Sequence, residues 1–286
     1  MTGFGFVPTY GGFEIDAMRE LDINVAGLSL NLKDAPAVGP TIGRLFWIYY
    51  GDFRDVLYVD NRPLDERKAT MGEPARIHTA GIDGVRLVPI GPGAVDVFGY
   101  AYGQFGDYQG LTQHAWAYGA EAGYRLTETW GKPWMRVGIN SGSGDPDPTD
   151  DRHQTFFQNL PTAWLYAQFP FYNMMNNQDV FAQWILEPHP MVSGRLDFHW
   201  LRLNSAQDLA YFGGGATKND FFGYGGYNGK GATDLAYLVH LMVTVRPTAF
   251  LTVNAFYAHA FGQDVIDNAF VGSAGNYAFL ELLFAL

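Results

Sequence analysis

Hydrophobic and polar residues alternate along most of this chain, in segments of about ten residues that end at turn-forming residues. In the segment 192–200 the even positions carry Val, Gly, Leu, Phe and Trp, whereas the odd positions carry Ser, Arg, Asp and His. The segments 235–246 and 250–261 alternate in the same way on either side of Pro247, which indicates a hairpin with a tight turn. Successive side chains of a β-strand point to opposite faces of a sheet, so each segment predicts a strand with one apolar and one polar face.

The same pattern predicts about twelve strands in all. They lie at 22–33, 42–54, 76–88, 94–105, 116–126, 133–141, 162–169, 179–187, 192–200, 235–246, 250–261 and 276–286. Long polar connections at 56–75, 142–161 and 204–234 alternate with short turns rich in glycine and proline. Long loops on one rim and short turns on the other are typical of outer-membrane barrels. We therefore predict an all-β fold, an antiparallel transmembrane β-barrel built as a single domain over residues 1–286.

The composition argues against several other classes of protein. Aromatic residues make up 16% of the chain and there are 35 glycines, whereas charged residues are only 16%, compared with about 25% in soluble domains. No stretch approaches the roughly 20 consecutive apolar residues of a membrane-spanning helix. The net charge of -11 argues against a nucleic-acid partner, and the absence of cysteine excludes disulfides and thiolate metal sites. A secreted or periplasmic β-rich carbohydrate-binding protein shares the tyrosine and glycine content, but this alternative leaves the aromatic surplus unexplained.

Both ends of the sequence bear on localisation. The first residues, MTGFGFVPTYGG, have neither the basic nor the apolar region of an export signal. A protein of the bacterial outer membrane must be exported, so we expect the N-terminal part of the full protein to be missing. The last residues, NYAFLELLFAL, alternate up to Leu286, and outer-membrane barrels typically close with such a strand.

An ordered set of short motifs adds a family resemblance. The stretch RVGINSGSGD from Arg136 is followed by an acidic loop and later by NNQDVFAQWILEPHP. The motif residues are Ser143, Gly144, Asp145, Thr155, Phe156, Leu160, Pro161 and Thr162. In this order they resemble the alginate export family of outer-membrane barrels. The resemblance implies a monomeric barrel of about eighteen strands, of which this chain is the C-terminal part, and passage of an anionic polysaccharide through a pore lined with arginine.

The predicted site is the polar, inward face of the strands. By alternation its arginines are Arg44, Arg54, Arg76, Arg86, Arg125, Arg136, Arg195 and Arg246. Its acidic residues are Asp52, Glu121, Glu187, Asp197 and Glu281. The planar guanidinium group donates two parallel hydrogen bonds to a carboxylate and stays charged, so it suits acidic sugars or other anionic solutes. Alternatively, these arginines pair with acidic residues across strands and stiffen the wall without a net field.

Other candidate chemistry is weaker. Asp145, Asp147, Asp150 and Asp151 offer oxygen ligands for Ca²⁺, but Asp150 stands where an EF-hand needs glycine and Phe156 where it needs glutamate. A solvated acidic loop is the favoured interpretation, and no cofactor is expected. The tryptophans expected at the membrane interfaces, with sugar stacking as the alternative, are Trp47, Trp116, Trp134, Trp184 and Trp200.

Enzyme motifs such as G-x-S-x-G, H-E-x-x-H and the P-loop are absent from the sequence. The predicted function is therefore an outer-membrane channel or exporter in contact with lipid. A general porin of unrelated substrate and the secreted carbohydrate-binding protein are the alternatives.

Overall fold

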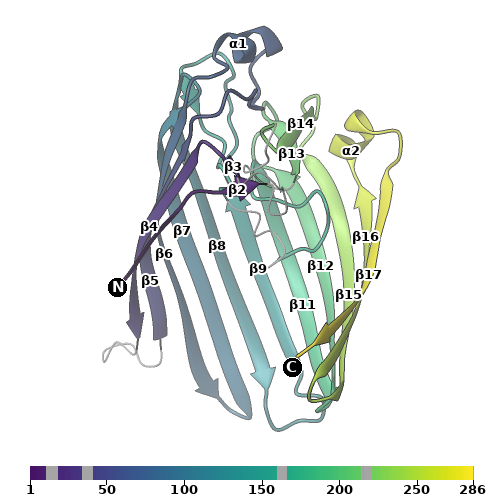
Figure 1. The fold of residues 1–286 in the computed structure, drawn as a ribbon. Helices are drawn as coiled ribbons and strands as arrows, with labels where there is room; N and C mark the ends of the chain where they lie inside the picture. Colours follow the sequence, from purple (N-terminus) through teal and green to yellow (C-terminus); the bar gives the residue numbers. More distant parts are fainter. Residues whose placement is uncertain (11–18, 34–40, 160–165, 214, 216–220, 286) are drawn as a thin grey trace.

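The computed structural model describes residues 1–10, 19–33, 41–159, 166–213, 215 and 221–285 (Figure 1). Its main feature is one sheet of 13 strands, in which the neighbours follow the order β1-β4-β5-β6-β7-β8-β9-β11-β12-β15-β16-β17. These neighbours are antiparallel, and β10 is added parallel to β8. Among the described residues no ladder joins β1 to β17, so the closed barrel stays a prediction.

The strands of the large sheet are β1 (Thr2–Phe6), β4 (Ile23–Lys33), β5 (Thr41–Asp52), β6 (Ala75–Ile90), β7 (Gly93–Tyr108), β8 (Leu111–Leu126), β9 (Trp134–Gly142), β10 (Arg152–His153), β11 (Asn177–His189), β12 (Val192–Leu203), β15 (Asp234–Thr248), β16 (Leu251–Gly262) and β17 (Ala274–Phe284). Two small sheets pair β2 (Thr9–Tyr10) with β3 (Arg19–Glu20) and β13 (Leu209–Gly213) with β14 (Tyr224–Asn228). The helices are α1 (Leu64–Ala69) and α2 (Asp264–Ala269). No helix in the described part of the chain is long and apolar enough to cross a membrane.

The all-β, antiparallel fold predicted from the alternation is confirmed, and most of the expected strands are present within a few residues of their predicted bounds. The strand expected at 162–169 is the exception. Residues 162–165 lie outside the described residues, and 166–169 form no strand. The sequence did not predict β1, which pairs with β4 from Thr2 to Phe6.

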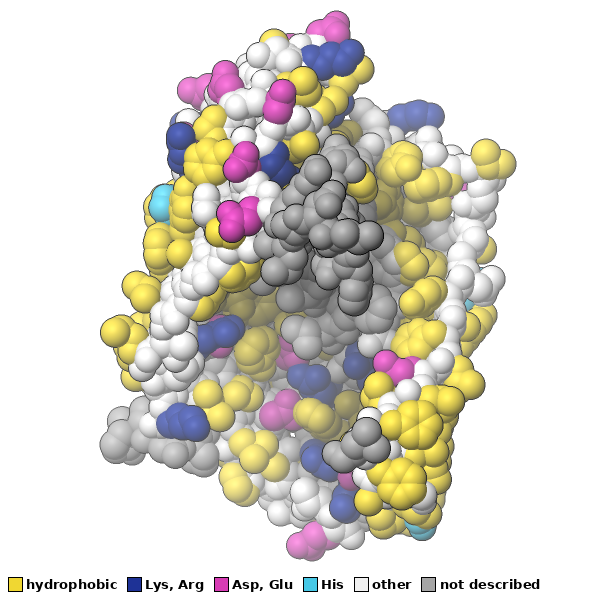
Figure 2. All heavy atoms as spheres, in the orientation of Figure 1, with side chains coloured by type: hydrophobic (Ala, Val, Ile, Leu, Met, Phe, Trp, Pro, Cys, Tyr) yellow, Lys and Arg dark blue, Asp and Glu magenta, His cyan; other side chains and the backbone are white. Residues whose placement is uncertain are grey.

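The two rims of the sheet differ as the loop lengths predicted. Figure 1 shows α1, α2, β13 and β14 together at one end of the slanted strands, and short connections at the opposite end. The sheet curves around a hollow, and Figure 2 shows this hollow from the open side. We call the two ends the loop rim and the turn rim, and the concave face of the sheet the inner face.

The outer face of the sheet carries the large apolar side chains. In β8 the burial alternates residue by residue, with Ala115, Ala117 and Glu121 buried on the inner face, and Trp116 and Tyr118 exposed on the outer face. Trp116 is 43% exposed and Glu121 only 5%. This pattern is the reverse of a soluble protein, in which large apolar side chains are buried and carboxylates are exposed. An outer face of this kind requires an apolar surrounding.

At the loop rim the inner face is covered by the long connections, which fold into the hollow. Their aromatic side chains form a buried core with the strand ends: Phe222 stacks on Tyr58 with ring centroids 4.1 Å apart, and Phe157 lies 5.0 Å from Tyr50. Tyr108 closes the cluster edge-on against Tyr58 at 5.2 Å. These contacts tie residues far apart in the sequence to one another, and we call this assembly the loop plug.

Adjacent phenylalanines provide a test of the loop plug. Phe222 is 1% exposed, whereas Phe221 is 59% exposed. We expect Phe222→Ala to reduce the stability of the plug by about 3–5 kcal/mol, because it removes a buried ring and leaves a cavity. Phe221→Ala should change it by less than about 0.5 kcal/mol. Hydrogen exchange of residues 53–63 and 143–159 measures both effects, and equal exchange in the two variants would contradict the packing described above.

Candidate functional site

Charged side chains gather on the inner face between the loop plug and the turn rim. Figure 2 shows them in the lower half of the hollow, with Lys and Arg next to Asp and Glu. They come from neighbouring strands at inward positions of the register, as Arg44 faces Asp83 across β5 and β6 and Arg136 faces Gln183 across β9 and β11. The sheet thus brings together groups that are far apart in the sequence.

Arg136 is the most highly connected of these arginines. Its guanidinium group forms an ion pair with Glu121, donates to Oε1 of Gln183 at 3.1 Å and lies 3.7 Å from Asp96. The group also sits over the ring of Trp134, 4.8 Å from the centroid. Gly123 makes this arrangement fit, since a Cβ there would lie 2.5 Å from the Asp96 carboxylate.

Three further arginines on the inner face have carboxylate partners. Arg44 donates from Nε and Nη2 to Oδ2 of Asp83, at 2.8 and 2.6 Å. The other two pairs are Arg195 with Asp197 at 2.6 Å and Arg125 with Glu187 at 2.8 Å. Within the described residues, the predicted inward arginines of the strands are thus largely ion-paired, as the alternative interpretation of the sequence foresaw.

Three of the four inner-face ion pairs share an orientation, in which the arginine side chain is more exposed than its partner: 48% against 14% for Arg44 and Asp83, 20% against 3% for Arg136 and Glu121, and 29% against 3% for Arg195 and Asp197. Arg125 and Glu187 are equally exposed, at 38% and 39%. In the three oriented pairs the carboxylates lie against the sheet, and the guanidinium groups lie toward the hollow. At these three positions the groups presented to the hollow are hydrogen-bond donors, although each pair is neutral overall.

The other predicted residues that point inward lie outside this group of ion pairs. Arg54 and Asp52 form a buried ion pair at 2.6 Å inside the loop plug, where Tyr50 and Tyr58 also donate to Asp52. Arg246 is exposed at the turn rim and lines a pocket there with Lys132 and Glu187. Glu281 accepts a hydrogen bond from Asn254 at 2.7 Å.

Arg76 and Arg86 occupy the outer face, which differs from the inward position expected from the sequence. Arg86 is paired in register with Val97, which is 48% exposed on that face, and Arg76 lies 3.9 Å from the exposed Asp107. Arg76 is at the loop rim, and its guanidinium group reaches over the ring of Phe53. A long side chain near a strand end can keep its charge in water while its stem lies on apolar surface.

The tryptophans divide between the two faces. Trp116, Trp184 and Trp200 are exposed on the outer face, and Trp47 stacks on His78 there at 5.6 Å. Trp134 instead lies on the inner face and donates from Nε1 to Asp96 at 2.7 Å.

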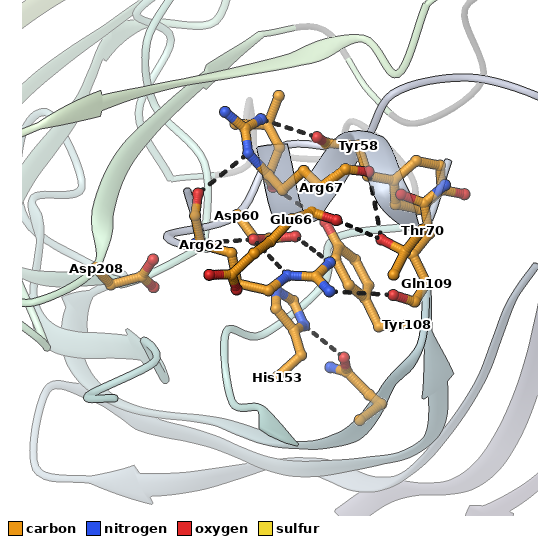
Figure 3. A network of polar contacts seen from close by, with 12 residues as sticks. Tyr58, Asp60, Arg62, Glu66, Arg67, Thr70, Tyr108, Gln109, His153 and Asp208 are labelled. Atoms are coloured by element: carbon orange, nitrogen blue, oxygen red, sulfur yellow. Dashed lines mark hydrogen bonds and ion pairs between the residues drawn. The ribbon is translucent and has the colours of Figure 1, made fainter. Parts of the chain in front are cut away.

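Two copies of an Asp-x-Arg motif fix the loop plug, and the sequence analysis missed them. In both Asp52–Arg54 and Asp60–Arg62 the arginine donates from its backbone N and Nε to one carboxylate oxygen and from Nη2 to the other. Figure 3 shows Arg62 held between Asp60 and the carbonyl oxygen of Gln109, which accepts from Nη1 at 3.2 Å. The repeated spacing within a few residues was the signal available in the sequence.

The comparison with known families agrees with this geometry. The protein-family model described as "Alginate export" matches residues 68–280, which is most of the chain. The chain belongs to the alginate export family. No curated protein matches the sequence. The match over residues 68–280 confirms the resemblance seen in the motifs. The alginate export family is an outer-membrane family of exporters and not a family of enzymes.

The structure explains the motif residues shared with the alginate export family. The backbone N of Ser143 donates to the carbonyl oxygen of Trp116, and Oγ of Ser143 accepts from the backbone N of Trp116. The carbonyl oxygen of Ser143 accepts from the backbone N of Phe156 and of Asn176. A Cβ on Gly144 would lie 2.0 Å from Oδ1 of Asn176, so only glycine fits. Leu160, Pro161 and Thr162 lie outside the described residues. The described part of the motif anchors the acidic loop to β8.

Asp145 and Asp208 form a buried acidic pair within that anchor. Asp208 accepts hydrogen bonds from Thr155, Tyr211 and the backbone N of Asp145, at 2.6–2.9 Å. Oδ2 of Asp145 is buried without a hydrogen-bond partner. Burial raises the pKa of Asp145 to about 7 and that of Asp208 to about 6.

The four aspartates considered for Ca²⁺ do not converge on one point. Asp147, Asp150 and Asp151 are exposed, unlike Asp145. Asp147 accepts a hydrogen bond from the backbone N of Thr149, and Asp150 accepts one from the backbone N of Arg152. In the described part of the chain they form no group of metal-ligand atoms.

The acidic pair gives a prediction about pH. A carboxyl whose pKa is higher in the folded state binds its proton more tightly there, so its contribution to stability falls as the pH rises from the unfolded pKa of about 4 to the folded pKa of about 7. We expect Asp145→Asn to stabilise the protein against urea relative to the wild type, by an amount that grows between about pH 4 and pH 7 and levels off at higher pH. The variant is compared with the wild type because both proteins contain His153, whose pKa is lowered to about 4 by burial. This histidine makes the stability of both proteins rise with pH at lower pH, opposite to the effect of Asp145.

The control is Asp147→Asn, since Asp147 is exposed and hydrogen bonds from Thr149 lower its pKa. It should give no stabilisation at high pH. A destabilised Asp145→Asn variant at pH 8 would refute the assignment.

Proposed function

We propose that the chain forms part of a transmembrane β-barrel in the bacterial outer membrane, through which an anionic polysaccharide or another anionic solute is exported. Membership of the alginate export family supports the export role. The observation that carries the finer proposal is the orientation of the ion pairs, with guanidinium groups of Arg44, Arg136 and Arg195 toward the hollow and carboxylates behind them.

Such a surface suits a polymer that must slide. A guanidinium group that is already paired still has free N–H donors, so it binds a sugar carboxylate or hydroxyl more weakly than an unpaired arginine does. Transport needs binding strong enough for entry and weak enough for release, from several sites in sequence. The protein wall has a low dielectric constant, so it concentrates the electric field of these groups within the confined hollow. The charges of exposed loops are instead screened by salt within about 8–10 Å.

The apolar outer face supports the membrane location. A secreted carbohydrate-binding protein would expose this face to water at a large cost, because side chains such as Phe198 and Leu280 are 46% and 69% exposed on it. Lipid hydrocarbon removes that cost, while the backbone groups are satisfied within the sheet.

A charge placed on the outer face tests the contact with lipid. Ala120 lies near the middle of β8 on the outer face, and Thr127 lies in the turn that follows. We expect Ala120→Arg to destabilise the protein folded into lipid vesicles by about 2–4 kcal/mol, and Thr127→Arg to change it by less than about 1 kcal/mol. Urea unfolding in vesicles measures both. Equal effects would count against burial of this face in hydrocarbon.

Ion selectivity tests the donor-lined pore. In planar bilayers we expect the protein to prefer anions, in spite of its net charge of -11. Arg44→Gln combined with Arg246→Gln should shift the reversal potential toward cation preference, because both groups are exposed on the inner side. The control, Arg76→Gln with Arg86→Gln, removes the same charge from the outer face and should leave selectivity unchanged. Cation preference in the unmodified protein, or equal shifts in both double variants, would overturn the proposal.

A further inference from the structure

A cluster of metal-binding side chains lies on the inner face of β11, β12 and β15. Asp197 is paired in register with His240, and His199 follows two residues along β12 on the same face. One ligand atom from each of Asp197, His199 and His240 lies within 4.8 Å of the others. All three side chains are buried, with exposures of 3%, 0% and 2%.

Each of these side chains has a buried polar atom without a hydrogen-bond partner among the residues that the structure describes. These atoms are Nε2 of His199, Nε2 of His240 and Oδ1 of Asp197. A buried polar atom without a partner costs about 1–3 kcal/mol, so such atoms are rare, and several at one place call for an explanation. Two imidazole nitrogens and a carboxylate oxygen are the donors that first-row transition metals take up.

The neighbouring side chains occupy one atom of His199 and one of Asp197 and leave another atom of each available. Nδ1 of His199 lies 2.9 and 3.0 Å from the two oxygens of Asp179, and Tyr172 donates to Asp179 at 2.9 Å. A carboxylate at Nδ1 keeps the proton on that nitrogen and leaves Nε2 as a basic acceptor, as is common for histidines that bind metals. Arg195 occupies Oδ2 of Asp197 and leaves Oδ1 free.

The charge of the cluster also favours a cation. Asp179 and Asp197 contribute two carboxylates and Arg195 one guanidinium group, so one carboxylate has no arginine opposite it within the cluster. Burial makes such an uncompensated charge costly.

We propose that His199, His240 and Asp197 bind a divalent transition-metal ion, with Zn²⁺ as the best match to the donor set. The ion would cross-link β12, which carries Asp197 and His199, to β15, which carries His240. The proposal does not depend on the exported substrate.

The experiment uses tag-free protein refolded into detergent, either with EDTA or with Co²⁺. The absorption spectrum of bound Co²⁺ reports the coordination geometry of the ion. Zn²⁺ then replaces Co²⁺ in the same protein. We expect one Co²⁺ per chain, a visible spectrum of tetrahedral or five-coordinate type, and thermal stabilisation by Zn²⁺. His240→Gln should abolish binding. Asp179→Asn, which changes only the group behind His199, should weaken it about 10- to 100-fold.

The control is His114→Gln, because His114 is an exposed histidine on the outer face of β8. It should bind Co²⁺ as the wild type does, and heat-modified migration on a gel verifies that each variant is folded. Absence of stoichiometric binding to the folded wild type, or the same affinity in Asp179→Asn and His240→Gln as in the wild type, would overturn the proposal.

Discussion

A β-strand sends successive side chains to opposite faces of its sheet, and in this chain the outer face is occupied by large apolar groups. Most polar and charged residues of the strands are therefore directed to the inner face. There they meet a surrounding in which an unpaired charge is costly. The ion pairs of Arg44, Arg136 and Arg195 follow from this constraint, since each finds a carboxylate on its own or an adjacent strand.

The same constraint shapes the two halves of the hollow differently. Toward the turn rim the inner face is left open and carries oriented ion pairs. Toward the loop rim the loop plug covers it with a core around Tyr58, Phe157 and Phe222. Local Asp-x-Arg pairs, such as Asp60–Arg62, hold the incoming loops.

The inner wall also contains a feature that the family function does not use. Among the described residues, His199 and His240 each leave a buried ring nitrogen without a hydrogen-bond partner, next to Oδ1 of Asp197. Asp179 and Tyr172 hold one of these imidazoles in place, which makes the arrangement more ordered than accidental burial of histidine requires.

The sequence by itself determined the strands with strong alternation, such as β8 and β12, together with the long loops and the family. A two-residue period and turn residues are local properties, so they are visible without the fold. The sequence did not determine whether residues 166–169 form a strand, because the same apolar residues are expected in a strand and in a segment packed inside the hollow. The alternation predicted Arg76 and Arg86 on the inner face, whereas the structure has both on the outer face, where a long cationic side chain can reach water near a strand end.

Only the tertiary structure decided which charges meet. The partners of Arg136 come from three other strands, and the histidine cluster joins two strands whose residues are some forty positions apart in the sequence. Register sets these contacts, and register depends on the pairing of whole strands. For this reason the sequence could identify the residues of the inner face but not that guanidinium groups would lie toward the hollow with carboxylates behind them.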